Sequence, residues 1–231
     1  MFKNLRQIWN PKNKDIKKRI GYTLFALLIF AVGNTITVPG MKAVVQDLGF
    51  LEYLNAISGG GLKRFTIFGL GVMPYISASI VVSILQMDMI PYFSDLKNDG
   101  AKGRQKLNQI TRYLGIIIAF FQGFAMVYAF GGKNLSAMEI MKSSIVMTAG
   151  TSFLLWLGDR ITQKGLGNGI SLIIMAGIIS TVPKMFIDAF TSLVIDNSSL
   201  LIGIVSYAVF VIIYLLLVVA IVFVEESERR I

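Results

Sequence analysis

Six long runs without a charged residue divide this chain. The longest, Ser198–Val224, has 27 residues. Because roughly 20 apolar residues of helix cross the hydrocarbon core of a bilayer, each run predicts a transmembrane helix, although the fourth run is short and the fifth begins with several glycines. The six predicted spans are Ile20–Val38, Phe65–Met87, Tyr113–Gly132, Ser143–Gly158, Gly165–Pro183 and Ser198–Val224.

The composition supports a membrane protein over a soluble one. Hydrophobic residues make up 55% of the chain and charged residues only 15%, a balance outside the range of ordinary soluble domains. A soluble helical protein would need polar faces with helical periodicity, and the sixth run has none. The sequence therefore predicts an all-α, polytopic bundle of transmembrane helices.

The basic residues predict the orientation. Sixteen of the 22 Lys and Arg residues lie on one set of alternating connections: the tail to Arg19, residues 88–112 and 159–164, and the tail from Glu225. Cytoplasmic loops are enriched in Lys and Arg, so both termini are expected in the cytoplasm. An even number of spans requires the same. No small-residue cleavage site follows the first run, which is interpreted as a retained span.

The basic N-terminal segment, residues 1–19, is expected to lie against anionic lipid. Nucleic-acid binding is the other interpretation of a net charge of +9. It is disfavoured, because the basic residues follow the predicted topology and do not form one patch interleaved with aromatic residues.

The residue types present in the chain disfavour a catalytic site. The chain has no Cys and no His, which excludes disulfides, thiolate chemistry and most metal sites. The uncharged spans contain no group for a proton relay. We therefore expect neither an enzyme nor a bound cofactor. Polar uncharged residues within the spans, such as Asn34 and Ser77, indicate either hydrogen bonding between helices or a path lined by water.

The stretch "SGGGLKRFTIFGLGVMPYISAS", residues 58–79, is unusual for a membrane helix. The three glycines at 59–61 disfavour a helix and predict a hinge or turn. Pro74 has no amide hydrogen, so the second span is expected to bend or divide between Gly69 and Pro74. Freed backbone groups in a membrane need partners in protein or water, which indicates a broken helix beside a cavity. An ordinary proline kink is the alternative, and composition does not decide between them.

A second irregularity joins the fourth and fifth spans. The stretch "DRITQKGLGNGIS" is short, basic and rich in glycine, which predicts that the two helices are antiparallel neighbours. We expect a compact bundle with an irregular segment on its outer side, at about residues 52–65, that is able to move.

Several long motifs resemble one known family. "ITVPGM", "SGGGLKRFTIFGLGVMPYISASI", "GRQKLNQITRYLG", "WLGDRITQKGLGNGISLIIMAGI" and the final "VEESERRI" are similar, in this order, to segments of the SecY family, the central subunit of the protein-conducting channel. The motifs extend over nearly the whole chain. Val72 stands where isoleucine is common in the family, and Ser83 where bacterial members often have glutamine.

The resemblance implies an architecture. The family has ten spans in two pseudo-symmetric halves of inverted topology, so this chain is expected to be the N-terminal half plus the first span of the second half, either as a truncated product or as part of a longer one. The implied divisions are a cytoplasmic segment at 1–19, the first five-span half at 20–187, and an outer loop, sixth span and the start of the next cytoplasmic loop at 188–231.

The resemblance also implies the functional residues. A short plug helix at about residues 55–65 would block the outer side of the pore. A ring of branched aliphatic residues at the constriction would gate by dewetting, excluding hydrated ions without binding the passing chain. Ser77 would lie at the lateral gate. The plug would include Asn55, Ile57, Ser58, Gly59, Gly60, Gly61 and Leu62, and the ring Val72, Ile76 and Ile174.

The implied function is passage of unfolded polypeptides across the bacterial plasma membrane, with lateral release of hydrophobic segments into it. Implied partners are the small subunits SecE and SecG, the SecA motor, the ribosome, polypeptides bearing signal sequences, and anionic lipid. Two other functions are considered. A secondary transporter of small solutes also uses broken helices. A scaffold protein would use its spans only for packing.

Overall fold

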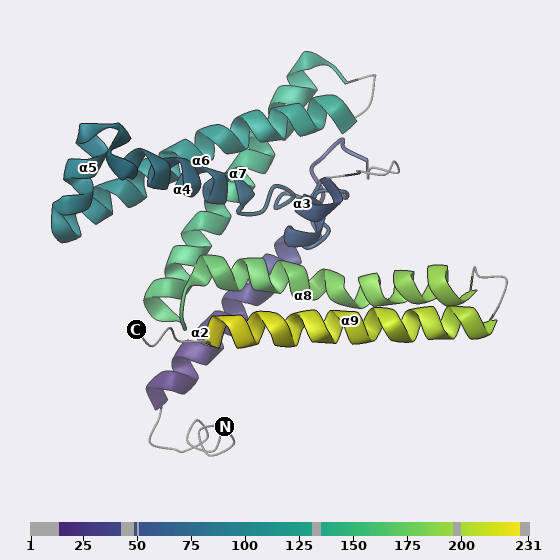
Figure 1. The fold of residues 1–231 in the computed structure, drawn as a ribbon. Coiled ribbons are helices and arrows are strands. Elements are labelled where there is room, and N and C mark those ends of the chain that lie inside the picture. Colours follow the sequence, from purple (N-terminus) through teal and green to yellow (C-terminus); the bar gives the residue numbers. More distant parts are fainter. Residues whose placement is uncertain (1–13, 43–48, 50, 131–134, 196–199, 227–231) are drawn as a thin grey trace. The chain divides into compact units, whose positions relative to one another are not determined.

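The computed structural model describes residues 14–42, 49, 51–130, 135–195 and 200–226 (Figure 1). It divides into two compact units, Met1–Ser180 and Thr181–Ile231. The helices in chain order are α2 (Lys14–Gly33), α3 (Leu51–Ile57), α4 (Met73–Ile84), α5 (Pro91–Asn98), α6 (Gly100–Phe130), α7 (Ala137–Lys164), α8 (Gly169–Phe190) and α9 (Leu200–Glu226). One short π-helix, η1 (Leu85–Met89), follows α4, and another, η2 (Thr191–Ile195), follows α8.

Among the residues that the structure describes, four helical segments are long and apolar enough to cross a membrane. They confirm the third to sixth predicted spans and are Gly100–Phe130, Ala137–Lys164, Gly169–Ile195 and Leu200–Val224. The segments Met73–Met87 and Pro91–Asn98 are bent by 94° relative to each other and count as a fifth span only if taken together. The sequence predicted six spans.

The first predicted span is shorter than expected. A helix to Val38 was predicted, but α2 ends at Gly33. Thr37 pairs with Thr66 in an isolated antiparallel bridge, and the Val38 amide donates to the Phe65 carbonyl at 2.7 Å. The prediction was wrong because residues 35–38 are all β-branched and Pro39 restricts Val38 to extended conformations. Extended backbone is stable here because residues 65–67 supply its hydrogen-bond partners.

The second predicted span begins eight residues later than its apolar run. Residues 65–72 form turns, apart from the bridge at Thr66, and α4 starts at Met73 with Pro74 in its first turn. A proline there loses no helical hydrogen bond, since the first amides of a helix have no partner within it. Pro74 therefore starts this helix and does not kink it, so the kink alternative is wrong.

Several helices extend beyond the apolar runs. Helix α7 continues through Asp159 and Arg160 to Lys164, and the 88–112 connection contains α5 and the first turns of α6. These residues were predicted to be loops. Helix α8 likewise continues through Pro183, where the fifth span was expected to end. An apolar run indicates which part of a helix can lie in hydrocarbon, but it does not indicate where the helix ends. Charged residues with long side chains are good helix formers, so a helix can continue past the apolar run into water.

Helix α6 packs against both α4 and α7 (Figure 1). Small residues permit the close approach: a Cβ on Gly115 would lie 3.2 Å from the Tyr75 Cα of α4, and one on Gly123 would lie 3.5 Å from the Ser144 carbonyl oxygen of α7. An ion pair between Arg112 of α6 and Asp159, near the C-terminal end of α7, joins the same helices.

The second unit is built from the last part of α8, η2 and α9. Figure 1 shows the end of α8 and α9 as antiparallel neighbours. Aromatic rings join them edge to face: Phe186 of α8 contacts Tyr214 of α9 at 5.3 Å between ring centroids, and Phe190 contacts Tyr207 at 5.3 Å. Such pairs contribute about 0.5–1.5 kcal/mol beyond area burial.

Candidate functional site

Residues 58–72 connect α3 to α4 through a series of turns. Gly59 and Gly60 have positive φ angles of 70° and 76°, which residues with side chains rarely adopt. The Gly60 amide donates to the Asn55 carbonyl and the Gly59 amide to the Ala56 carbonyl, which is the Schellman arrangement that ends a helix. The predicted turn at the three glycines is confirmed.

Residues 55–65, predicted to be a plug and called the plug segment below, were expected to form a short helix. The helix present is α3, Leu51–Ile57, so only Asn55–Ile57 of the segment is helical. The remainder forms turns because the Schellman motif ends the helix directly before the glycines.

Side chains of the plug segment bind its own backbone. The Asn55 Oδ1 accepts from the Lys63 amide at 3.0 Å, and the Ser58 hydroxyl donates to the Asn55 carbonyl at 3.0 Å. The Ser58 Oγ also accepts from the Leu62 amide at 3.2 Å. Arg64 donates from Nη2 to the Gly59 carbonyl and from Nε to the Gly60 carbonyl. These bonds give the turns a defined shape without regular secondary structure.

Asn34 binds the plug segment from outside it. Directly after α2, its Nδ2 donates to the carbonyls of Ser58 at 3.1 Å and Gly59 at 2.9 Å. Its Oδ1 accepts from the Thr66 hydroxyl at 3.0 Å. Asn34 is 6% exposed, Ser58 1% and Thr66 0%. The amide thus uses both donors and one acceptor within a buried site.

Helix α8 lies against the same segment. A Cβ on Gly59 would lie 2.9 Å from the Ser180 Oγ and 3.4 Å from the Gly177 Cα. The Ser180 hydroxyl itself donates to the Gly177 carbonyl at 2.7 Å. Glycine at both positions lets the backbone of the plug segment contact the backbone of α8.

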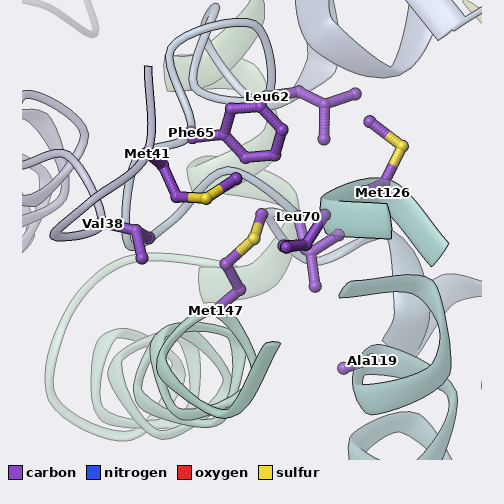
Figure 2. Close-up of a cluster of buried hydrophobic side chains, with 9 residues drawn as sticks. Val38, Met41, Leu62, Phe65, Leu70, Ala119, Met126 and Met147 are labelled. Carbon is purple, nitrogen blue, oxygen red and sulfur yellow. The ribbon is translucent and has the colours of Figure 1, made fainter. Parts of the chain in front are cut away.

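The apolar side of the plug segment is enclosed. Leu62 and Phe65 are 3% and 0% exposed and belong to a cluster that also contains Val38 and Met41. Figure 2 shows Met147 of α7 and Leu70 lying close together beneath the Phe65 ring, with Met126 of α6 at the side of the cluster. The plug segment is therefore packed against α6 and α7 as well as bonded to Asn34.

The three residues predicted for the pore ring belong to a second cluster. Val72, the residue before α4, is 2% exposed and lies within it. Ile76 of α4 and Ile174 of α8 are partly buried and pack against it. Helices α2, α4, α7 and α8 all contribute to this cluster. The structure thus brings all three residues to one apolar region, whereas Ser77, predicted for the lateral gate, is a half-buried residue of α4.

A row of aromatic rings crosses this second cluster. Phe68 stacks on Phe30 of α2 at 6.2 Å and on Phe153 of α7 at 5.8 Å, each with interplanar angles of 6°. Phe153 contacts Trp156, over which the Arg160 guanidinium lies 5.5 Å from the ring centroid. Phe68 thus anchors the turns that precede α4 between two helices.

Sequence reasoning missed two features of this site. Asn34 was considered only as one of many polar residues in the spans, and Phe68 was not considered. The signal for Asn34 was an amide between Gly33 and a run of β-branched residues, where a helix is weak. Nothing in the sequence indicated its partners. Ile173, one residue before Ile174, is the more enclosed of the two at 2% exposed.

Comparisons with known proteins identify the family. The SecY family model matches residues 66–231, well over half of the chain. The protein translocase subunit SecY 1 of Lactobacillus kefiranofaciens is 40% identical over 100% of this chain and 56% of its own length. The protein translocase subunit SecY of Staphylococcus aureus (strain NCTC 8325 / PS 47) is 46% identical over 77% of this chain and 44% of its own length. The chain thus spans about half the length of these relatives.

Solved structures share the fold. Sec61 in the canine ribosome-channel complex from the endoplasmic reticulum superposes with a TM-score of 0.70 at 20% identity, covering 96% of this chain and 50% of that one. A structure of a protein-conducting channel superposes with a TM-score of 0.68 at 20% identity, covering 91% of this chain and 49% of that one. With the family model and the sequence relatives, this similarity leads to one conclusion: the chain belongs to the SecY family.

Proposed function

We propose that this chain forms the first part of a channel subunit through which unfolded polypeptides cross the bacterial plasma membrane and hydrophobic segments leave sideways into it. The names of its relatives, translocase subunits, support this function. Four to five apolar spans support a multi-pass membrane protein. The resemblance of the sequence motifs to SecY extends beyond the residues matched by the family model.

One observation carries the proposal: an enclosed, non-helical segment leads directly into the start of α4. Irregular backbone at membrane depth is tolerated where protein or a water-filled cavity surrounds it. Residues 58–72 meet this condition through the Asn34 bonds and the cluster around Phe65. A segment folded by its own hydrogen bonds can move as a unit, which suits a plug.

The pore ring would lie at the junction of this segment with α4. Val72, Ile76 and Ile174 offer branched aliphatic side chains to one apolar cluster. Such a constriction disfavours hydrated ions and gives a passing polypeptide no hydrogen bonds to hold it. The remaining ring residues and the opposite wall of the lateral gate, facing Ser77, would come from the second half of the subunit.

The remaining features follow from the same proposal. Residues 1–19 and both termini would be cytoplasmic, residues 20–187 would form the first half of the channel, and residues 188–231 would begin the second. SecE and SecG would surround the subunit, while SecA or a ribosome would drive a signal-bearing polypeptide through it. The subunit itself would be a passive channel without enzymatic activity.

The direct test is ion conductance of the full-length protein with its partner subunits in planar bilayers. Ile76→Ser and Ile174→Ser, separately and together, should raise the resting conductance, because hydroxyls favour wetting of the constriction. The matched control is Ile179→Ser in α8, whose side chain is 58% exposed. Unchanged conductance in the double variant would reject the ring.

A second measurement addresses the cargo. A secretory chain stalled during translocation should crosslink to a photoreactive residue at position 72 or 76. Absence of this contact would reject a protein channel in favour of a small-solute transporter or a scaffold. Similarity to translocase subunits does not favour the small-solute transporter.

A further inference from the structure

We propose that Asn34 is a positioning residue that latches the plug segment in its closed position and so sets how readily this segment leaves. The inference rests on the proposed channel function. Asn34 directly follows α2, whereas its partners Ser58 and Gly59 lie 24 and 25 residues later. The bonds therefore join the segment to a separate part of the bundle.

The hydrogen bonds of the Asn34 side chain, called the latch below, use both the nitrogen and the oxygen of its amide. The Nδ2 group of Asn34 binds the carbonyls of Ser58 and Gly59, which are within the plug segment. The Oδ1 atom accepts from Thr66, whose hydroxyl also lies 3.3 Å from the Gly61 carbonyl. Both ends of the glycine turn are therefore held by one amide. By contrast, the bonds of Asn55, Ser58 and Arg64 described above run between residues 55–64 and would move with the segment.

The glycines leave space for this amide. A Cβ on Gly59 would lie 2.7 Å from the Asn34 Nδ2, and a Cβ on Gly61 would lie 2.3 Å from the Asn34 Oδ1. Side chains at either position would displace the amide. The three glycines thus serve two purposes: two of them provide the left-handed turn, and Gly59 and Gly61 admit Asn34.

The burial of Asn34 and its partners determines whether loss of these hydrogen bonds favours the closed or the displaced position of the plug segment. Water does not replace a lost hydrogen bond at this site, because the side chains of Asn34, Ser58 and Thr66 are all buried. Without the amide, the Ser58 carbonyl would be unpaired in the closed position but hydrated once the segment leaves. Removing the latch therefore favours the displaced position.

The test uses the full-length protein with its partner subunits in proteoliposomes, without other cysteines. Leu62→Cys reports on the segment, because Leu62 is 3% exposed. We measure its labelling rate with a membrane-impermeant maleimide and, in the same vesicles, the chloride leak. Adding Asn34→Leu should raise the labelling rate about tenfold, as expected for the loss of two to three buried hydrogen bonds.

Two further variants address folding and specificity. Thr66→Val keeps the side-chain shape, removes one bond to Asn34, and should raise labelling about threefold even if Asn34→Leu does not fold. The control is Thr35→Val: Thr35 is exposed, and its hydroxyl donates to the Val32 carbonyl, three residues earlier, at 2.7 Å. It should leave labelling unchanged.

The outcomes separate the latch from the channel. Increased labelling with increased leak supports both, and increased labelling without leak supports the latch but rejects the plug function. Unchanged labelling in folded Asn34→Leu and Thr66→Val overturns the latch whatever the leak does. An equal increase from Thr35→Val also overturns it, because the effect would then not depend on Asn34.

Discussion

Gly177 of α8 lies directly against Ile57 of α3: a Cβ built on Gly177 would be 2.3 Å from the Ile57 carbonyl oxygen. A side chain at this position would be too close to the Ile57 backbone, so either α8 or the segment around Ile57 would have to move. Because Ile57 precedes the glycine turn, the position of α8 and the position of the plug segment are coupled through this glycine.

Gly177→Ala should therefore displace the plug segment or α8. We expect faster maleimide labelling of Leu62→Cys and a lower thermal midpoint of the purified complex. Gly21→Ala in α2 is the control: a Cβ on Gly21 would meet no neighbouring segment within 4 Å, and alanine favours a helix over glycine by about 0.8–1.0 kcal/mol. A Gly177→Ala protein as closed and as stable as the parent would contradict the coupling.

The aromatic row provides a second prediction. A Cβ on Gly33 would lie 2.0 Å from the Phe68 ring, which stacks between Phe30 and Phe153. Gly33→Ala should destabilise the protein because this ring cannot shift without losing a stacking partner. Adding Phe68→Leu should recover part of the loss, since the smaller side chain frees the space.

The measurement is a double-mutant cycle on the thermal midpoint in detergent. Phe68→Leu alone should cost about 1 kcal/mol or more through lost packing. The double variant should be more stable than the sum of the single effects predicts. Strict additivity would show that Gly33 and Phe68 do not interact.

The ion pair between Arg112 and Asp159 provides a third prediction. Their side chains are 44% and 23% exposed, so the pair is partly screened by solvent. Arg112→Gln and Asp159→Asn should each destabilise the protein by about 1 kcal/mol or less, and the double variant by less than the sum.

Chemical unfolding of the detergent-solubilised protein measures this coupling. Asp15 and Arg19, an ion pair within α2 whose side chains are 79% and 47% exposed, are the control and should show a smaller coupling energy, about 0.3–0.5 kcal/mol. A coupling for Arg112 and Asp159 no larger than for this control would indicate that the contact between α6 and α7 depends on packing alone.

The spans from Tyr113 onward could be predicted from the sequence, because a long run of residues without charge favours a helix in the hydrocarbon core of a membrane. The turn at Gly59–Gly61 could also be predicted, since glycine tolerates positive φ wherever it occurs. The ends of the helices could not be predicted in the same way. The uncharged residues 34–38 and 65–72 belong to runs that predict spans, yet they form extended backbone and turns.

The packing of the residues predicted for the constriction could not be derived from the sequence either. Val72, Ile76 and Ile174 were selected by resemblance, and their packing in one cluster depends on α2 and α7 as much as on their own helices. Their role in a pore ring stays a prediction. Ser77 and the orientation of the termini also stay predictions.

The sequence by itself determined where this chain is apolar, where it turns and which chemistry it lacks, because hydropathy, backbone preference and residue type are local properties. Only the tertiary structure decided that Asn34 meets Ser58, Gly59 and Thr66, and that Gly177 meets Ile57. These contacts join residues far apart in the chain. Their positions depend on how the helices pack, and no periodicity or motif in the sequence records that packing.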